Sequence, residues 1–274
     1  MKRILAPTDF SKHAEEALKS AVQIAKKNGS EIFLLHLLEL PHQLHDAMTN
    51  GSSIPEVMLF IKKAHEKLQK IKEQPHLQGI TISTTVQFER AFDGILSFNK
   101  KNNIDLIVMG SSGSSGIEEM LIGSNTEKVV RLSDIPVLVV KKDLDTFNIK
   151  NIVFASDFTK EIKKPFLKMI EFANIFDANL ALVMICTPNS FKTTAIAEKT
   201  MKDFIADFEV KNYSINIYND SNIEKGIRNF TNTIGADLIG LCTHGRTGLS
   251  HFFNGSIGED LVNHSTKPVI TFKI

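Results

Sequence analysis

The sequence of 274 residues has only two cysteines, Cys186 and Cys242, and no tryptophan. Both cysteines lie in or beside apolar runs, so nothing indicates a disulfide framework or a cysteine-based metal cluster. Acidic and basic side chains nearly balance, 31 against 32, for a formal net charge of +1. Such a charge provides no long-range field to attract nucleic acid or an anionic membrane, so neither is expected as a partner.

Long apolar stretches are also missing from the sequence. No segment approaches the roughly 20 consecutive apolar residues that a membrane helix needs. The first residues, 1–7, read as a short strand and lack the longer apolar segment of a secretion signal. Hydrophobic residues at 42% and charged residues at 23% are typical of an ordinary folded protein. The sequence therefore predicts a soluble, cytoplasmic protein, and its length favours two domains.

An internal repeat is the most informative feature of the chain. The segment 4–11, Ile-Leu-Ala-Pro-Thr-Asp-Phe-Ser, recurs at 153–159 as Val-Phe-Ala-Ser-Asp-Phe-Thr. Asp157 lies 148 positions after its counterpart Asp9. The second half of the chain therefore restarts near residue 151.

A second repeated segment shows where the halves differ in length. The Asp-Leu-Ile of 105–107 recurs at 237–239, only 132 positions later, so the first half carries 16 additional residues. We place them in 41–55, where proline, histidine, asparagine, glycine and serine indicate a loop. The repeat predicts two tandem domains, a first at 1–142 and a second at 149–274. A short linker is expected around 143–150.

The pattern within each half predicts an α/β fold. Short apolar runs alternate with longer segments of helical period, which is typical of a parallel sheet covered by helices. The first helix has apolar residues three and four positions apart, Ser11 as its N-cap and Gly29 as its stop. Five strands are expected in each half, at 2–6, 32–38, 80–86, 106–109 and 137–140, and at 152–155, 180–184, 214–218, 238–241 and 269–272.

A segment rich in glycine and serine, 110–116, begins where a buried strand is expected to end, and Gly123 and Ser124 follow it. At the carboxyl end of a parallel sheet, loops leave the strands and the next helices present their amino ends, so ligands bind there. Glycines let the backbone approach a phosphate, and free N–H groups at a helix start attract the anion. The segment therefore predicts a phosphate-binding site.

The spacing Gly110-x2-Gly113-x9-Gly123-Ser124 resembles the ATP-binding signature of the universal stress protein family. Further similarity in 7–11, 34–37 and 126–139 extends the resemblance over essentially the whole first half. It implies a Rossmann-like fold of the adenine-nucleotide α-hydrolase type, with five mostly parallel strands sandwiched by helices in each domain. It also implies ATP as ligand, or ADP or AMP, together with Mg²⁺. The nucleotide-binding residues would be Pro7, Thr8, Asp9, Leu37, Met109, Gly110, Gly113, Gly123, Ser124, Asn125 and Thr126.

The resemblance assigns a role to several of these residues. Asp9 and Gly110 would face the ribose, and the backbone of Leu37 would contact adenine. The phosphates would be held by Gly113, Gly123 and Ser124, with Thr126 as a further candidate. The spacing alone establishes none of these roles.

The second half retains three of the four signature positions, and Cys242 replaces the first glycine. A cysteine there could crowd a ribose or merely narrow the pocket. Gly258 stands where the first half has Thr126, which removes a hydroxyl. Nucleotide binding by this half stays open, with the residues Ser156, Asp157, Ile185, His244, Gly245, Gly255 and Ser256.

Several candidates also have a simpler structural interpretation. Asp9 and Asp157 could cap the helices that follow them, and the Gly/Ser segment could be a flexible surface loop. His36 lies in an apolar strand and is typical of a hydrogen-bonded core histidine. His42 and His45 are not accompanied by a second ligand pair with zinc spacing, so no metal site is predicted.

Common enzyme motifs do not occur in the sequence. It has neither a Walker-type loop, nor Gly-x-Gly-x2-Gly, nor the hydrolase Gly-x-Ser-x-Gly. We therefore expect an ATP-binding regulatory protein that acts in a stress response through nucleotide-dependent interaction with another protein. A slow ATPase or a phosphoryl or nucleotidyl transferase is one alternative, and a nucleotide-free scaffold is another.

The resemblance also predicts how the halves assemble. Universal stress proteins pair through their last strands, so 136–141 and 268–273 would pair edge to edge and make the chain an intramolecular pseudo-dimer. Such pairing would cover two otherwise exposed sheet edges. Further assembly into a homodimer stays open.

Overall fold

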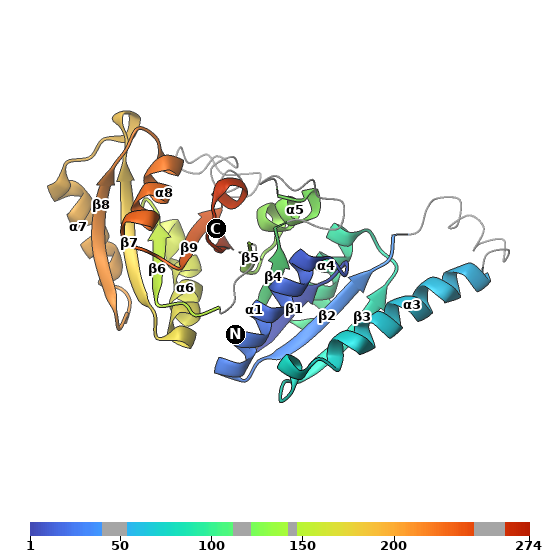
Figure 1. The fold of residues 1–274 in the computed structure, drawn as a ribbon. Helices are drawn as coiled ribbons and strands as arrows, with labels where there is room; N and C mark the ends of the chain where they lie inside the picture. The colour runs from blue at the N-terminus through green and yellow to red at the C-terminus, as the bar shows by residue number, and fades with distance from the viewer. Residues whose placement is uncertain (40–53, 112–121, 142–146, 244–260) are drawn as a thin grey trace.

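The computed structural model describes residues 1–39, 54–111, 122–141, 147–243 and 261–274. They form one ten-stranded sheet with helices on both faces (Figure 1). The strands are β1 (Arg3–Pro7), β2 (Glu31–Leu37), β3 (Ile82–Gln87), β4 (Leu106–Gly110), β5 (Val137–Val140), β6 (Asn151–Ala155), β7 (Asn179–Cys186), β8 (Tyr213–Asn219), β9 (Leu238–Thr243) and β10 (Val269–Lys273). The α-helices are α1 (Lys12–Asn28), α3 (Ile54–Lys72), α4 (Ala91–Asn102), α5 (Ser124–Leu132), α6 (Lys163–Phe176), α7 (Thr194–Ile205) and α8 (Ile223–Thr233).

The strand order, β3-β2-β1-β4-β5-β10-β9-β6-β7-β8, repeats the same parallel arrangement in both halves and reverses it at the centre. There β5 and β10 pair antiparallel, with Val139 opposite Val269 and Val137 opposite Thr271. The predicted α/β fold is confirmed, and so is the pairing of the final strands within the chain. The two five-stranded sheets are therefore continuous, and neither β5 nor β10 is an exposed edge.

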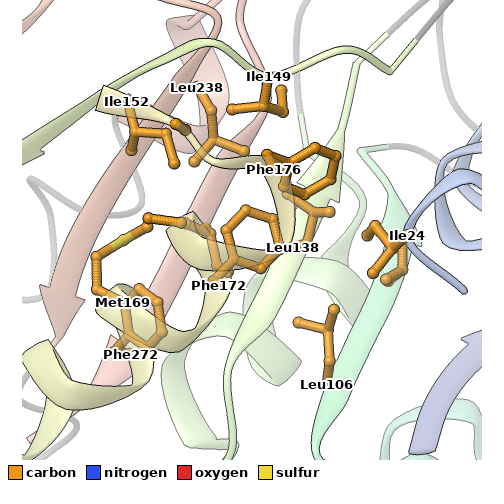
Figure 2. Close-up of a cluster of buried hydrophobic side chains, with 14 of the residues drawn as sticks. Ile24, Leu106, Leu138, Ile149, Ile152, Met169, Phe172, Phe176, Leu238 and Phe272 are labelled. Atoms are coloured by element: carbon orange, nitrogen blue, oxygen red, sulfur yellow. The ribbon is translucent and has the colours of Figure 1, made fainter. Parts of the chain in front are cut away.

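Side chains alternate between the two faces of the sheet, as the period of a strand requires. On β4, Leu106 and Val108 join one buried cluster, whereas Ile107 and Met109 join the cluster on the opposite face. The first cluster crosses the junction between the halves, because α1 and α6 both contribute to it. Figure 2 shows side chains from α1, β5 and α6 in this cluster, among them Ile24, Leu138 and Phe176.

The described end of the predicted linker belongs to this core. Phe147 and Ile149 are buried, and the Phe147 ring meets the Phe176 ring edge-on with 5.7 Å between centroids. The Phe147 N–H also donates to Oε1 of Gln23 on α1, at 2.8 Å. Phe147 and Ile149 therefore pack between the halves, within the segment that the sequence predicted only as a short linker.

The first helix has the predicted ends. The Ser11 hydroxyl accepts the Ala14 N–H at 3.3 Å, and Gly29 adopts the left-handed conformation, φ 70°, that ends the helix. Most of the segment predicted to hold the additional length of the first half, 41–55, lies outside the described residues. Helix α3 has 19 residues and its counterpart α7 has 12, so part of the additional length extends this helix.

Lys141 follows β5 at the junction, and its Nζ donates to the Asn263 carbonyl oxygen at 3.1 Å. Burial lowers the pKa of Lys141 from 10.5 to about 8.

No helix in the described part of the chain is long and apolar enough to cross a membrane.

The pKa of Lys141 predicts a pH dependence of stability. Between pH 8 and 10 the unfolded chain keeps a proton on this lysine that the folded chain has lost, so unfolding becomes less favourable as the pH rises. The free energy of unfolding of the wild type, relative to Lys141→Met, should therefore increase over this range. Urea unfolding of both proteins at several pH values measures the difference, and a constant difference would contradict the prediction.

Candidate functional site

A cavity of about 350 Å³ opens at the carboxyl ends of β1, β2 and β4. Ten of the eleven residues predicted for the first site line it, namely Pro7, Thr8, Asp9, Leu37, Met109, Gly110, Gly123, Ser124, Asn125 and Thr126. The eleventh, Gly113, lies outside the described residues. The lining also includes residues that the sequence analysis missed, which are Ala14, Leu35, Glu39, Ala91 and Ile95.

The turn after β1 holds Asp9 at the cavity. The Thr8 hydroxyl accepts the Phe10 N–H at 3.1 Å, and Oδ1 of Asp9 accepts the Ser11 N–H at 3.0 Å. Phe10 has a φ of 65°, which is uncommon for a residue other than glycine and is held here by the two bonds. Ser11 is the N-cap of α1, so the interpretation of Asp9 as the helix cap is wrong. The exposed Asp9 instead lines the cavity.

His36 supports the same turn from β2. Its Nδ1 lies 2.8 Å from the Thr8 carbonyl oxygen, and its ring centroid is 4.3 Å from that of Phe10. Burial lowers the pKa of His36, and Nδ1 donates to this oxygen because a carbonyl oxygen can only accept. The predicted hydrogen bond of His36 is confirmed, but the residue is only partly buried and lies at the margin of the core.

The segment between β4 and α5 begins and ends at the cavity. The Ser111 N–H donates to the Val140 carbonyl at 3.1 Å, and the Gly123 N–H donates to the Ser111 carbonyl at 2.7 Å. Gly123 is the N-cap of α5 and supplies no side-chain cap. No described residue accepts the N–H groups of Ser124, Asn125 and Thr126. The open donors of this helix start therefore belong to these three residues, because the N–H of Gly123 is already used.

Thr126 has a structural bond that the sequence did not reveal. Its side chain is buried, and its hydroxyl donates to the Gly110 carbonyl at 3.0 Å, which joins α5 to the end of β4. The Thr126 hydroxyl proton is therefore engaged within the protein, although the residue lines the cavity.

Gly110 is required by packing as well as by its place at the cavity. A Cβ atom on Gly110 would lie 2.7 Å from the carbonyl oxygen and 2.8 Å from the carbonyl carbon of His13, in the first turn of α1. These are backbone atoms of a helix that packs on the sheet, so they cannot give way cheaply. The close approach of α1 to β4 therefore depends on a residue without a side chain.

A second glycine shapes the cavity from α4. A Cβ on Gly94 would overlap Cδ2 of Leu37, and a Cβ on its counterpart Gly226 would lie 2.6 Å from Cγ2 of Ile185. The glycine in each helix thus makes room for the side chain at the end of β2 or β7. The repeat of these glycines, 132 positions apart, was the sequence signal that could have revealed them.

The described lining is acidic. It contains the carboxylates of Asp9 and Glu39 and neither lysine nor arginine. Oε1 of Glu39 accepts the Ala91 N–H at the start of α4, at 2.7 Å. Among the described residues, no group of three or more His, Cys, Asp or Glu could hold a metal ion. His42 and His45 lie outside the described residues.

The second half repeats the turn with less open surroundings. The Ser156 hydroxyl accepts the Phe158 N–H at 3.0 Å, and Oδ1 of Asp157 accepts the Thr159 N–H at 3.4 Å. Asp157 is only 8% exposed and Ile185 only 3%, whereas Asp9 is exposed and Leu37 is partly exposed. The other residues named for a second site, His244, Gly245, Gly255 and Ser256, lie outside the described residues.

Cys242 occupies the position of Gly110 and is fully buried. Its side chain joins the cluster that contains Leu238 and Phe272, on the face where Gly110 meets α1. The counterpart of the first α1 turn is a 3-10 turn, Lys160–Ile162, and α6 begins only at Lys163. Cys242 thus packs in the core beneath a differently formed helix start. Burial, and secondarily the charge of Asp157, raises the pKa of the Cys242 thiol above its ordinary range.

The contact between α1 and β4 predicts a stability difference between two glycine substitutions. Gly110→Ala should lower the free energy of unfolding by about 1–3 kcal/mol, because its methyl group meets helix backbone. Gly240→Ala on β9 is the matched control, since its methyl group would meet the flexible Met169 side chain, with Sδ 2.8 Å away. Urea unfolding compares the two, and an equal or larger loss for Gly240→Ala would contradict this account.

Burial of both cysteines predicts low thiol reactivity. Cys186 and Cys242 are 3% and 0% exposed, and the Cys242 thiol stays protonated at neutral pH. Ellman's reagent should therefore titrate no thiol in the native protein at pH 8 and two after denaturation. Rapid native labelling, located by peptide mass spectrometry, would contradict this assignment for the labelled residue.

Comparisons with known proteins agree with this fold. The model of the universal stress protein family matches residues 1–141 and 215–273. A universal stress protein of Methanocaldococcus jannaschii is 34% identical over 142 residues, which cover 52% of this chain and 82% of that protein. Another, from Synechocystis, is 22% identical over 296 aligned positions and covers 100% of both chains.

A solved structure has the same architecture over almost its full length. The universal stress protein from Archaeoglobus fulgidus matches with a TM-score of 0.77 at 22% identity, and the match covers 99% of this chain and 98% of that chain. The tandem α/β fold is therefore shared along the whole chain, and the family model matches most of it. The chain belongs to the universal stress protein family.

Proposed function

We propose that the first-half cavity binds one adenine nucleotide, ATP with Mg²⁺, and that the protein acts as a nucleotide-dependent regulator. The observation that carries this proposal is the agreement between the cavity and the glycine signature. Residues from 7–9, 109–110 and 123–126 are distant in sequence and line one cavity at the carboxyl ends of the strands. Its volume, about 350 Å³, is in the range of small-molecule sites.

The two ends of the cavity suit different parts of a nucleotide. At the α5 end, the open N–H groups of Ser124, Asn125 and Thr126 would bind phosphate oxygens, with the positive end of the helix dipole behind them. At the β2 end, Leu35, Leu37 and Ile95 provide an apolar wall for adenine. The carboxylate of Asp9 lies between these regions and would accept hydrogen bonds from ribose hydroxyls.

The charge of the lining supports a role for a divalent cation. The described lining contains two acidic residues, Asp9 and Glu39, and no basic side chain to balance a triphosphate. Mg²⁺ bound to the phosphates would offset this charge, as it commonly does where carboxylates and phosphates meet. The dependence of binding on Mg²⁺ is part of the proposal.

The difference between the halves supports one nucleotide per chain. Asp157 and Ile185 are buried where Asp9 and Leu37 are accessible. We therefore assign nucleotide binding to a first domain, 1–142, and a supporting role to a second, 149–274. In this proposal the occupied first site changes a surface that another cytoplasmic protein recognises during stress.

The test measures the nucleotide content and affinity of a matched pair of variants. Ser124→Glu places a carboxylate in the first turn of α5, where it suits the helix dipole but repels phosphate. Thr194→Glu makes the equivalent change at the exposed first residue of α7. We expect about one nucleotide per wild-type chain, at least tenfold weaker ATP·Mg²⁺ binding by Ser124→Glu, and unchanged binding by Thr194→Glu.

Released nucleotide is counted after denaturation of the purified protein, and affinity is measured by calorimetry. Absence of bound nucleotide, together with no shift of the melting temperature on adding ATP and Mg²⁺, would exclude the proposal and favour a nucleotide-free scaffold. Steady phosphate release by the wild type that is lost in Ser124→Glu would instead identify a slow ATPase.

A further inference from the structure

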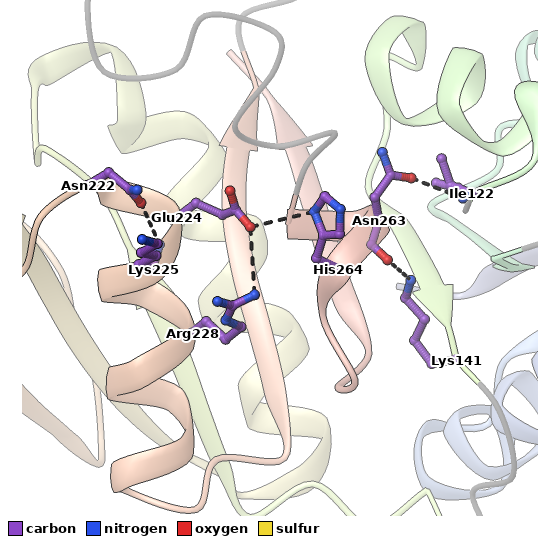
Figure 3. Close-up of polar contacts among 8 residues, drawn as sticks. All are labelled: Ile122, Lys141, Asn222, Glu224, Lys225, Arg228, Asn263 and His264. Atoms are coloured by element: carbon purple, nitrogen blue, oxygen red, sulfur yellow. Dashed lines mark hydrogen bonds and ion pairs between the residues drawn. The ribbon is translucent and has the colours of Figure 1, made fainter. Parts of the chain in front are cut away.

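The second half of the chain contacts the segment that leads into the first-half site. The N–H of Ile122, the residue before Gly123, donates to Oδ1 of Asn263 at 3.0 Å. The two residues are 141 positions apart, and the bond crosses the junction between the halves (Figure 3). Asn263 therefore anchors the chain directly before α5.

Asn263 is itself held from both halves. It follows Leu261 and Val262, which are 1% and 0% exposed, so the helical turn at 261–264 is fixed in the core of the second half. Nζ of Lys141, from the first half, donates to the Asn263 carbonyl at 3.1 Å. A side-chain amide on such a fixed turn is a well-positioned acceptor for the Ile122 N–H.

The neighbouring residue links this turn to the rest of the second half. Nδ1 of His264 lies 3.6 Å from Oε1 of Glu224 on α8, and the same oxygen lies 4.0 Å from Arg228 (Figure 3). These polar contacts link α8 to the turn at 261–264, and the Asn263 bond links that turn to the residues directly before α5. The position of α5 thus depends on groups outside the first half.

The consecutive backbone N–H groups at this helix start differ in their hydrogen-bond acceptors. Ile122 donates to the second half, Gly123 donates to Ser111 within the first half, and the groups of Ser124 to Thr126, which line the cavity, have no acceptor among the described residues. The first two bonds fix where the open donors lie. Loss of the Asn263 bond would leave the α5 start held by the bonds of Gly123 and Thr126 within the first half, and would allow the first turn to shift or fray.

The internal repeat has a different residue at the position of Asn263. The residue 132 positions earlier is Arg131, whose side chain differs in length, charge and hydrogen-bonding capacity. An arginine side chain has no acceptor for a backbone N–H, so Arg131 cannot make the bond that Asn263 makes. Asn263 thus serves the half with the intact glycine signature.

We propose that Asn263 is a positioning residue for the first-half nucleotide site, supplied across the junction by the second half. This inference rests on the proposed function, since it concerns the same site. Asn263 does not touch the nucleotide but holds the α5 start at the geometry that binds phosphate. Nucleotide binding in the first half is consequently coupled to the packing of the second half, and by linkage the nucleotide stabilises that packing.

The test compares Asn263→Ala with Asn263→Asp, which retains an acceptor oxygen, and with Asn232→Ala. Asn232 is exposed on α8, so the last variant makes the same substitution away from the junction. Hydrogen exchange of the Ile122 amide is measured in nucleotide-free protein by NMR, and ATP·Mg²⁺ affinity by calorimetry. Asn263→Ala should speed this exchange at least tenfold and weaken nucleotide binding about three- to tenfold. Asn263→Asp should keep the amide protected, and Asn232→Ala should change neither quantity.

The two readouts separate the possible failures. Unchanged exchange of Ile122 in Asn263→Ala would overturn the anchor itself. Faster exchange with unchanged affinity would overturn the positioning role and leave a packing contact. If the wild type binds no nucleotide, the proposed function fails and the coupling fails with it, while the exchange data still report the anchor independently.

Discussion

The antiparallel pairing of β5 with β10 is the constraint on which the rest of the structure depends. Each half alone would leave a strand edge and one side of its first helix uncovered, and the pairing buries both. It brings α1 and α6 over a shared core, in which the rings of Phe147 and Phe176 meet. It also brings Asn263 to the start of α5. The junction is therefore part of the hydrophobic core and part of the surroundings of the candidate site.

The two halves share a fold but differ in how open their strand ends are. The turn after the first strand is the same in both, with Phe10 and Phe158 at positive φ. In the first half Phe10 packs on His36, and the neighbouring Asp9 is accessible. In the second half Phe158 enters a cluster of phenylalanines and Asp157 is buried. Among the described residues, the first-half turn thus lines a cavity, whereas the corresponding turn of the second half packs in the core.

The glycines of the signature serve the fold as well as any ligand. Gly110 allows the backbone of α1 to approach β4, and the N–H of Gly123 closes the segment onto Ser111. Gly94, which lies outside the signature, has the same kind of role toward Leu37. A glycine pattern can therefore be maintained by packing and ligand binding together, because both require close approach to backbone atoms.

The sequence alone determined the α/β class, the repeat, the strands to within about two residues and the ends of α1, and the family resemblance named most of the residues that line the cavity. Hydrophobic period and glycine spacing are local properties, and the carboxyl ends of parallel strands converge whatever the details. Only the tertiary structure decided that Thr126 bonds Gly110, that Phe147 is core and that Asn263 reaches Ile122. These contacts join residues from different elements, and their geometry depends on helix packing and on the junction, which no local pattern encodes.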